Sequence, residues 1–328
     1  MSASPQAVAH MEARRRLALA TALATHRLWR RLDQDNLYQS WLGLMGDVIA
    51  LVVASQMRAV QMTDPWLLRL LGPENEDRPE ANRLIPAAFA GVDGAGRPLA
   101  DVLRAPVWTA LRMLTQGRPI VQALVSGQAL LDAIVQTAVA DTGRAADSVG
   151  MTARPSVTGY IRVVEAGACS RCIVLAGAEY QTDRAFLRHP RCKCGMEPVT
   201  RDHTPDAPSP KRLVDQMSEA QRRKTFGAAG AKALAEGADL GQLVNARRGM
   251  QSASVLGGRA VTTSEGTVRG EFRRQEFRRL QAEGAIPRSR SMRGFRPTRA
   301  RLMPEEIYRR ADDREHAVRL LREHGYIA

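Results

Sequence analysis

The sequence predicts a mainly α-helical protein with a small α+β module of the zinc-knuckle kind near its middle. Aromatic residues make up only 5% of the 328 residues, which favours an aliphatic, helical core. Apolar residues recur at helical spacing over the first half of the chain. A β-branched segment near residue 160 then leads into a cluster that contains all four cysteines. We therefore expect a helical N-terminal part, the small module and a basic helical C-terminal region.

Two long helices are expected at the N-terminus, over residues 8–33 and 36–62, where Leu, Met and Val form stripes without internal proline. Residues 73–98 are rich in Pro and Gly and predict a surface connection. Helical character resumes over 107–139. The expected breaks in that stretch are at Gly117-Arg118-Pro119 and at Ser126 or Gly127.

The most apolar stretch runs from Leu42 to Ala54 and is interrupted by Asp47. It is shorter than the roughly 20 apolar residues that a helix needs to cross a bilayer. The first residues reach the run Arg14-Arg15-Arg16 without the apolar segment of a signal peptide. We expect no membrane contact and a protein made in the cytoplasm.

The pattern changes near residue 150. Residues 156–164 alternate in the manner of a strand, and prolines between 202 and 212 mark a linker. A capping box at Ser218–Gln221 then opens a helix, and Gly237 is placed to end it. The remaining expected elements are a short helix capped by Asp239, a Gly/Ser/Thr-rich stretch over 252–270, a charged helix or arm to Leu280, a Pro/Arg/Gly-rich stretch to Arg301, and closing helices from Pro304 and from Asp312.

Composition divides the chain into a helical N-terminal domain (1–150), a strand with a Cys/His module (151–200), and a linker with a basic helical region (201–328). Of the net charge of +14, +10 lies from residue 201 onward, and residues 266–301 hold 11 basic and 3 acidic residues. This distribution predicts a polyanion as a neighbour. A solvated, arginine-rich linker would have the same composition.

The strongest chemical signal is the pair Cys169 and Cys172, followed by His189-Pro190-Arg191-Cys192-Lys193-Cys194. A C-x2-C turn can direct two thiolates at one tetrahedral ion, and a second short pair can complete the site. Zinc is the default ion for such soft ligands. The predicted ligands are Cys169, Cys172, Cys192 and Cys194, with His189 able to replace one cysteine because C-x-C is a tighter pair than C-x2-C.

Other interpretations of the cysteines stay open. A redox pair would normally lie in a thioredoxin-like βαβ setting, which this sequence lacks. The thiols could also be reduced and buried, or could form disulfides outside the cell. If zinc is bound, four protein ligands leave no position for water, so the expected role is structural and not catalytic.

At these residues the chain resembles the MuF-like minor head proteins of tailed bacteriophages. The shared order is a strand, C-x2-C, an Ala-Gly turn, an aromatic residue, His-Pro-x-Cys-x-Cys and the exit Pro198-Val199. The resemblance extends over about 150–328, to proteins of actinobacterial phages often labelled capsid maturation protease. The tail segments that carry it are Ala238–Gly249, Thr263–Gly266, Arg301–Tyr308 and Leu320–Ile327.

The resemblance implies a low-copy virion protein. It would act in head morphogenesis and in DNA packaging or ejection. The implied partners are the portal protein and the capsid and scaffold proteins, in the capsid interior of the virion and in the host cytoplasm during assembly. The basic tail adds an expected non-specific contact with packaged DNA. The arginines expected to make this contact are Arg269, Arg273, Arg274, Arg278 and Arg279.

Two alternatives accompany this interpretation. The first is the capsid maturation protease itself, but neither His-Glu-x-x-His nor Gly-x-Ser-x-Gly is present, so we nominate no catalytic residue. The second is a DNA-binding protein that uses residues 218–249 in the manner of a helix-turn-helix, with Arg247 and Arg248 at phosphate. The same arginines could instead fold back on the helix.

Overall fold

The computed structural model of the chain describes residues 3–73, 77–79, 82–165, 167–186, 188–201, 204–206, 209–255, 258–265, 270–297 and 299–327. It confirms the predicted fold class, because most of the chain is helical and the strands form two small three-stranded sheets. By compactness the chain divides into two units. Unit 1 holds residues 1–165 and 176–208, and unit 2 holds residues 166–175 and 209–328. The division by composition at residues 150 and 200 stays a prediction.

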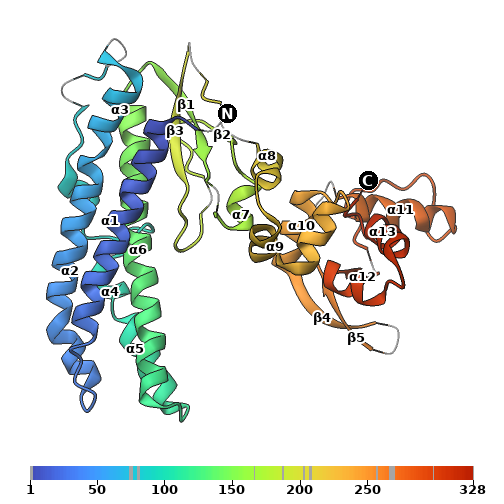
Figure 1. Cartoon of the computed structure of the whole chain (residues 1–328), viewed down its shortest axis with the longest axis horizontal. Coiled ribbons are helices and arrows are strands. Elements are labelled where there is room, and N and C mark those ends of the chain that lie inside the picture. Colours follow the sequence, from blue (N-terminus) through green and yellow to red (C-terminus); the bar gives the residue numbers. More distant parts are fainter. Residues whose placement is uncertain are drawn as a thin grey trace. The chain divides into compact units, whose positions relative to one another are not determined.

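Unit 1 is a bundle of long helices with one small sheet (Figure 1). Helices α1, α2, α5 and α6 run side by side, and α6 contacts each of the other three. The elements of unit 1 are α1 Pro5–Trp29, α2 Leu37–Gln61, α3 Thr63–Leu71, the 3-10 helix η3 Pro86–Phe89, α4 Leu99–Val102, α5 Ala105–Thr115, α6 Ile120–Thr152, β1 Val157–Val163, β2 Glu179–Tyr180 and β3 Gly195–Thr200.

The bundle core is aliphatic, as predicted, with two tryptophans at its centre. The rings of Trp29 and Trp41 meet edge to face with centroids 5.0 Å apart. Each indole N–H donates to a backbone carbonyl, that of Trp29 to Leu124 at 3.2 Å and that of Trp41 to Leu103 at 2.7 Å. Both large side chains are therefore buried without leaving a polar group unsatisfied.

Helix α6 differs from its prediction in length and continuity. It runs through Ser126 and Gly127 without a break and extends to Thr152, well past residue 139. A Cβ atom at Gly127 would lie 2.6 Å from a ring carbon of Trp29 and 2.7 Å from the carbonyl oxygen of Pro106. Glycine is present because the neighbouring helices approach closely, so it does not mark a helix end. The expected break at Gly117 is confirmed, with φ of +73°.

A buried polar cluster joins three helices of the bundle. The Asp147 carboxylate on α6 accepts hydrogen bonds from Thr63 at 3.1 Å and from Arg14, and it lies 3.1 Å from Nε2 of His10. Burial alone would raise the pKa of Asp147, but Arg14 and His10 lower it below its ordinary value. Burial also lowers the pKa of His10, whose ring stacks on Trp66 with centroids 4.1 Å apart.

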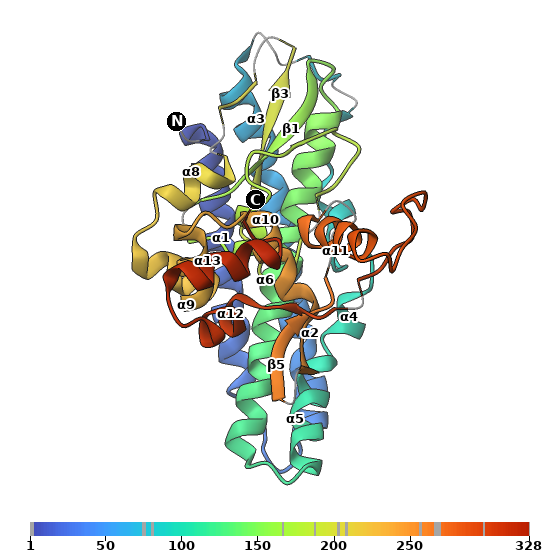
Figure 2. The ribbon, with the colours of Figure 1, turned by 90° about the vertical axis from the view of Figure 1, so that its right-hand side faces the viewer.

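The sheet of unit 1 has the order β2-β1-β3 with antiparallel pairs, and the predicted strand at 156–164 is confirmed as β1. Figure 2 shows β1 and β3 together near one end of α6, and both strands contact that helix. The backbone N–H of Ser4 donates to the Glu197 carboxylate at 3.1 Å, which ties the start of α1 to β3. Helices α1 and α6 therefore fix the strand that follows the second cysteine pair.

Two helical stretches, 37–71 and 120–152, are long and apolar enough to cross a bilayer by length and composition alone. Each is longer than the stretch 42–54, the most apolar stretch of the sequence. Core helices of soluble proteins satisfy the same criterion, and here Trp41 and Leu131 are fully buried against neighbouring helices. The absence of membrane contact stays a prediction.

Unit 2 combines short helices with the second sheet, of order β4-β5-β6. Its elements are α7 Ser170–Ile173, α8 Pro210–Asp215, α9 Glu219–Ala235, α10 Leu240–Ala246, the 3-10 helix η4 Arg247–Gly249, β4 Met250–Val255, β5 Gly258–Thr263, α11 Glu271–Ala282, β6 Arg301–Leu302, α12 Pro304–Arg310 and α13 Arg314–Glu323.

Local signals predicted most of the helices of unit 2 correctly. The capping box of Ser218 and Gln221, the stop at Gly237 with φ of +91°, and the cap at Asp239 are all present. The stretch 252–270 was predicted only as rich in Gly, Ser and Thr, and much of it forms two strands. Strands β4 and β5 pair antiparallel from Met250 with Thr263 to Val255 with Gly258.

The close packing at Gly127 yields a stability prediction. Gly127→Ala forces a methyl group into Trp29 and should destabilise unit 1 by about 1–3 kcal/mol, as overpacking does. Gly46→Ala is the matched control, because nothing lies within 4 Å of its Cβ position and alanine favours a helix by about 1 kcal/mol. Urea unfolding followed by tryptophan fluorescence measures both, since all four tryptophans belong to residues 1–165. Equal stabilisation by the two substitutions would contradict the packing argument.

Buried His324 yields a pH prediction for unit 2. Burial, with smaller contributions from Arg299 and Arg301, lowers the pKa of His324 from its ordinary 6.5 to about 3. Below pH 6.5 the unfolded chain therefore binds a proton that the folded chain excludes. Stability should fall as the pH is lowered from 6.5 to about 3, by at most about 1.4 kcal/mol per pH unit from this group.

Hydrogen–deuterium exchange of peptides from residues 299–327 measures this dependence. His324→Asn should flatten it, whereas the control His316→Gln, at a partly exposed position on α13, should leave the slope as in the wild type. An unchanged slope in His324→Asn would assign the pH dependence to other groups.

Candidate metal centre

The first cysteine pair lies on the short helix α7. Cys169 is its N-cap, and its carbonyl accepts hydrogen bonds from the backbone N–H groups of Cys172 at 2.9 Å and Ile173 at 3.0 Å. Gly167, two residues earlier, has φ of +85°, as expected of a glycine that permits a tight entry to the turn. This single turn places both sulfurs on one side, with Cys169 exposed and Cys172 buried.

The second pair follows a tight turn. The backbone N–H of Cys192 donates to the carbonyl of His189 at 3.0 Å, and Arg191 between them has φ of +60°. Pro190 followed by a residue of positive φ is typical of a type II turn. Gly195, directly after Cys194, does not have a positive φ. Its Cβ position instead lies 3.2 Å from Met11 on α1.

Helix α6 holds the second pair through its backbone. Nη1 of Arg144 donates to the carbonyls of Cys192 at 3.2 Å and Cys194 at 3.3 Å. Nη2 of the same guanidinium donates to Asp141 at 2.5 Å, which fixes its orientation. The N–H of Arg191 also donates to Oγ1 of Thr137 on α6, at 3.1 Å. The C-x-C segment is therefore positioned by a rigid helix and not by its own loop alone.

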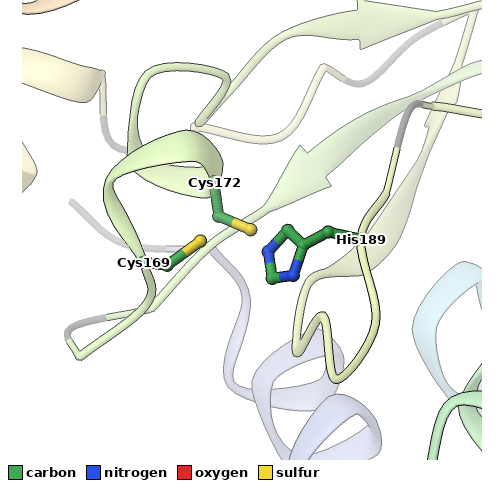
Figure 3. Close-up of side chains that lie close together, drawn as sticks. All are labelled: Cys169, Cys172 and His189. Carbon is green, nitrogen blue, oxygen red and sulfur yellow. The ribbon is translucent and has the colours of Figure 1, made fainter. Parts of the chain in front are cut away.

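The side chains of all five predicted ligands come together in two overlapping groups. In one, the ligand atoms of Cys169, Cys172 and His189 lie within 4.8 Å of one another (Figure 3). In the other, those of Cys172, Cys192 and Cys194 do so, and all three residues are buried. Cys172 belongs to both groups. The first-choice set of four cysteines is not gathered in a single group, since Cys169 groups with His189.

The spacing and the donor types of these groups suit a metal ion. Two ligand atoms that each lie about 2.3 Å from a tetrahedral zinc ion are about 3.8 Å apart. The ligand atoms of each group lie within 4.8 Å of one another, so a small inward movement of the side chains would bring them to this separation. The four cysteines are not joined by disulfide bonds. The buried group of Cys172, Cys192 and Cys194 could therefore hold a metal ion.

Two features around the ligands suit metal binding. Nδ1 of His189 lies 2.8 Å from the carbonyl oxygen of Pro190, which can only accept, so Nδ1 carries the proton and Nε2 carries the lone pair a metal needs. Nη2 of Arg162, from β1, lies 3.5 Å from Sγ of Cys194 and 3.9 Å from Sγ of Cys192. A guanidinium there offsets the negative charge that thiolate ligands bring.

The sequence does not single out these supporting arginines. Arg144 lies 48 residues before Cys192, Arg162 lies 32 residues before Cys194, and each is one of 44 arginines in the chain. No local pattern distinguishes them. The hydrophobic spacing of α6, which turns Arg144 inward with Asp141 and Asp147, is the only signal that could have done so.

The predicted DNA-contacting arginines are placed unequally. Arg273 is buried and donates to the carbonyls of Phe295 at 2.8 Å and Met292 at 2.7 Å. Arg279 is partly exposed and pairs with Glu276 and Glu283. Arg274 and Arg278 are exposed, and Arg274 pairs with Glu271 at 2.8 Å. Arg269 lies outside the described residues.

The helix-turn-helix outline is present as α9 and α10, but Arg247 turns back on the unit. Its guanidinium donates to the carbonyl of Phe226 and lies 3.2 Å from the carboxylate of Glu305. This is the internal role that the sequence left open, and it makes Arg247 a poor candidate for a phosphate contact.

The chain is similar to one family of known proteins over part of its length. The family described as VG15 protein matches residues 85–220, which include α6, the first sheet and all five predicted metal ligands. This match suggests a phage-encoded protein and with it a virion or infected-cell context. Comparisons with curated proteins and with solved structures found no match.

The geometry predicts that Cys172 is required for metal binding whichever group holds the ion. Cys172→Ser should reduce the bound metal from about one ion per chain to near zero, because no alternative sulfur lies in both groups. Ser170→Ala, on the same turn, is the matched control and should retain the ion. Elemental analysis of the purified, folded proteins measures the content.

Two further variants identify the group that is used. If the buried cysteines hold the ion, Cys194→Ser should lose it and Cys169→Ser should retain most of it; the reverse pattern assigns it to the group with His189. Full metal content in Cys172→Ser would exclude both groups.

Proposed function

We propose that this protein is a minor head protein of a tailed phage, with a structural role in head morphogenesis at the portal and capsid interior. The observation that carries the proposal is the position of the family match. Residues 85–220 contain the complete Cys/His segment, which is also where the chain resembles the MuF-like minor head proteins. Both similarities to phage proteins thus fall on the same residues.

We propose zinc as the ion of the metal centre. Thiolates and one imidazole are soft to borderline ligands, and zinc accepts both in tetrahedral sites. A zinc ion bound there would crosslink short turns that have few apolar residues of their own. Arg144 and Arg162 would hold the second pair and balance its charge. A structural zinc site would also need a fourth protein ligand to join one of the two groups of three.

The proposed partners are the portal protein, the capsid and scaffold proteins, and packaged DNA. For DNA we propose Arg278 first and Arg274 second, because both are exposed on α11 and Arg274 is already paired with Glu271, whereas Arg273 is engaged with backbone carbonyls inside unit 2. Contacts of this type would be non-specific and would weaken as salt is raised.

The protease alternative receives no support from the described histidines. His10 is buried against Asp147 and Trp66, and His324 is buried beside the N–H of Leu302. His26 contacts Gln128, and His316 contacts Asp312. Each has a partner that explains it structurally, and His203 lies outside the described residues.

Mass spectrometry of density-purified particles of the encoding phage tests the proposed function. We expect the protein in mature heads at a copy number far below that of the major capsid protein. Deletion of its gene should lower the yield of infectious particles, and complementation with the wild-type gene or Ser170→Ala should restore it. A Cys192→Ser, Cys194→Ser double variant should restore less, since the segment would lose its crosslink.

Two outcomes would redirect the assignment. Detection only in infected-cell lysate, with none in purified heads, would reject the minor head protein. Normal heads with uncleaved capsid or scaffold protein in the deletion would favour the maturation protease instead.

A further inference from the structure

An open groove of about 640 Å³ lies in unit 1 where helices α1, α2 and α3 meet (Figure 1). The buried rings of His10 and Trp66, which stack with centroids 4.1 Å apart, belong to its lining. Because His10 also contacts Asp147, the bundle core fixes this part of the groove in place. The apolar residues that complete the lining are Pro5, Ala9, Ala13, Met62 and Pro65.

Three arginines from three different helices line the same groove. Arg16 lies on α1, Arg58 on α2 and Arg69 on α3, and all three are exposed. Within the part of the chain that the structure describes, none of them forms an ion pair or a hydrogen bond through its side chain. The described lining also contains no aspartate or glutamate. The groove therefore presents three accessible guanidinium groups without a carboxylate to balance them.

Neighbouring titratable groups do not change this balance. Glu12 lies one turn before Arg16, but it is not part of the lining and its carboxylate makes two contacts of 2.6 Å with Arg15. Burial lowers the pKa of His10 below its ordinary value, and Arg69 makes a smaller contribution in the same direction. The imidazole is therefore neutral at pH 7, and the charge of the groove comes from the three arginines.

Helix electrostatics account for only part of this arrangement. Arg58 and Arg69 each lie in the last turn of their helix, where the helix dipole favours a positive charge. Arg16 lies in the middle of α1, so the dipole does not explain its position. Asp64, next to the groove on α3, pairs instead with Arg78 at 3.1 Å. Like charges that face one groove repel one another, and an anionic ligand would remove that repulsion.

The lining favours an acidic peptide over a nucleic acid as this ligand. Single strands are bound by stacking their bases on accessible aromatic rings, but Trp66 is only 1% exposed and is stacked against His10. A duplex is too wide to enter the groove, and its backbone would leave Ala13 and Met62 uncovered. A peptide can place carboxylates beside the arginines and an apolar side chain between them.

We propose that this groove binds an acidic segment of a partner protein, in which carboxylates flank an apolar side chain. The carboxylates pair with Arg16, Arg58 and Arg69, because a guanidinium holds a carboxylate through two parallel hydrogen bonds. The apolar side chain packs against Ala13 and Met62. The inference rests on the surface of unit 1 alone and does not depend on the proposed function or on the metal centre.

Fluorescence anisotropy of a labelled peptide, acetyl-Glu-Asp-Leu-Asp-Glu-amide, titrated with the full-length protein tests the proposal. The peptide should bind, and binding should weaken as salt is raised. An analogue with Gln and Asn in place of the acidic residues should bind about tenfold or more weakly, because it cannot form charged pairs. Replacement of the leucine by serine should weaken binding about fivefold, because the apolar lining loses its contact.

Two sets of variants locate the peptide on the protein. The triple variant Arg16→Gln, Arg58→Gln, Arg69→Gln should abolish binding. The matched control Arg27→Gln, Arg30→Gln, Arg31→Gln removes the same charge from three exposed arginines at the other end of α1 and should leave binding unchanged. Ala13→Trp fills the groove but keeps its arginines, and it should also abolish binding. Melting temperature is recorded for each variant to confirm that it is folded.

Several results would overturn the proposal. Equal losses in the two triple variants would show a general attraction to positive charge, and full binding by Ala13→Trp would place the peptide outside the groove. Tighter binding of single-stranded or duplex DNA of about 12 nucleotides than of the peptide, lost in the first triple variant, would assign the groove to nucleic acid. Absence of peptide binding at low salt would reject the site altogether.

Discussion

The buried carboxylate of Asp147 is the constraint on which the rest of unit 1 depends. A carboxylate removed from water is tolerated only when its hydrogen bonds and charge are satisfied, and here the partners come from α1 and from Thr63 at the start of α3. These helices must therefore meet α6 in one register. Arg144, one turn before Asp147 on α6, then reaches the carbonyls of Cys192 and Cys194. The register of the bundle thus determines where the second cysteine pair lies.

Sequence signals succeeded where the cause of a structure is local. The capping box at Ser218, the stop at Gly237 and the strand at 156–164 each depend on residues within a few positions, and each is present. The failures have distant causes. Gly127 continues a helix because Trp29 packs against it from another helix, and the hairpin of β4 and β5 is stabilised by pairing that residue type alone did not reveal.

For the candidate site, the motif predicted which residues come together but not how they divide between the two groups of ligands. Spacing alone could not show that Cys172 belongs to both groups. It also could not show Arg162 beside the sulfurs. Ligand identity is encoded in a short segment, whereas the surrounding charge is supplied by side chains from β1 and α6.

The arginines of this chain serve two purposes, because some organise the interior and others carry charge on the surface. The sequence alone does not distinguish the two kinds. Six arginines are buried among the described residues, namely Arg14, Arg144, Arg154, Arg162, Arg273 and Arg301. Five of them donate to backbone carbonyls, as Arg301 does to His324 at 2.8 Å and Arg154 to Gly150 at 2.8 Å. A guanidinium offers five donors in a fixed plane and so can join several backbone segments, which a lysine ammonium cannot do equally well. Part of the positive charge therefore organises the interior, and total charge overstates the surface that a polyanion could meet.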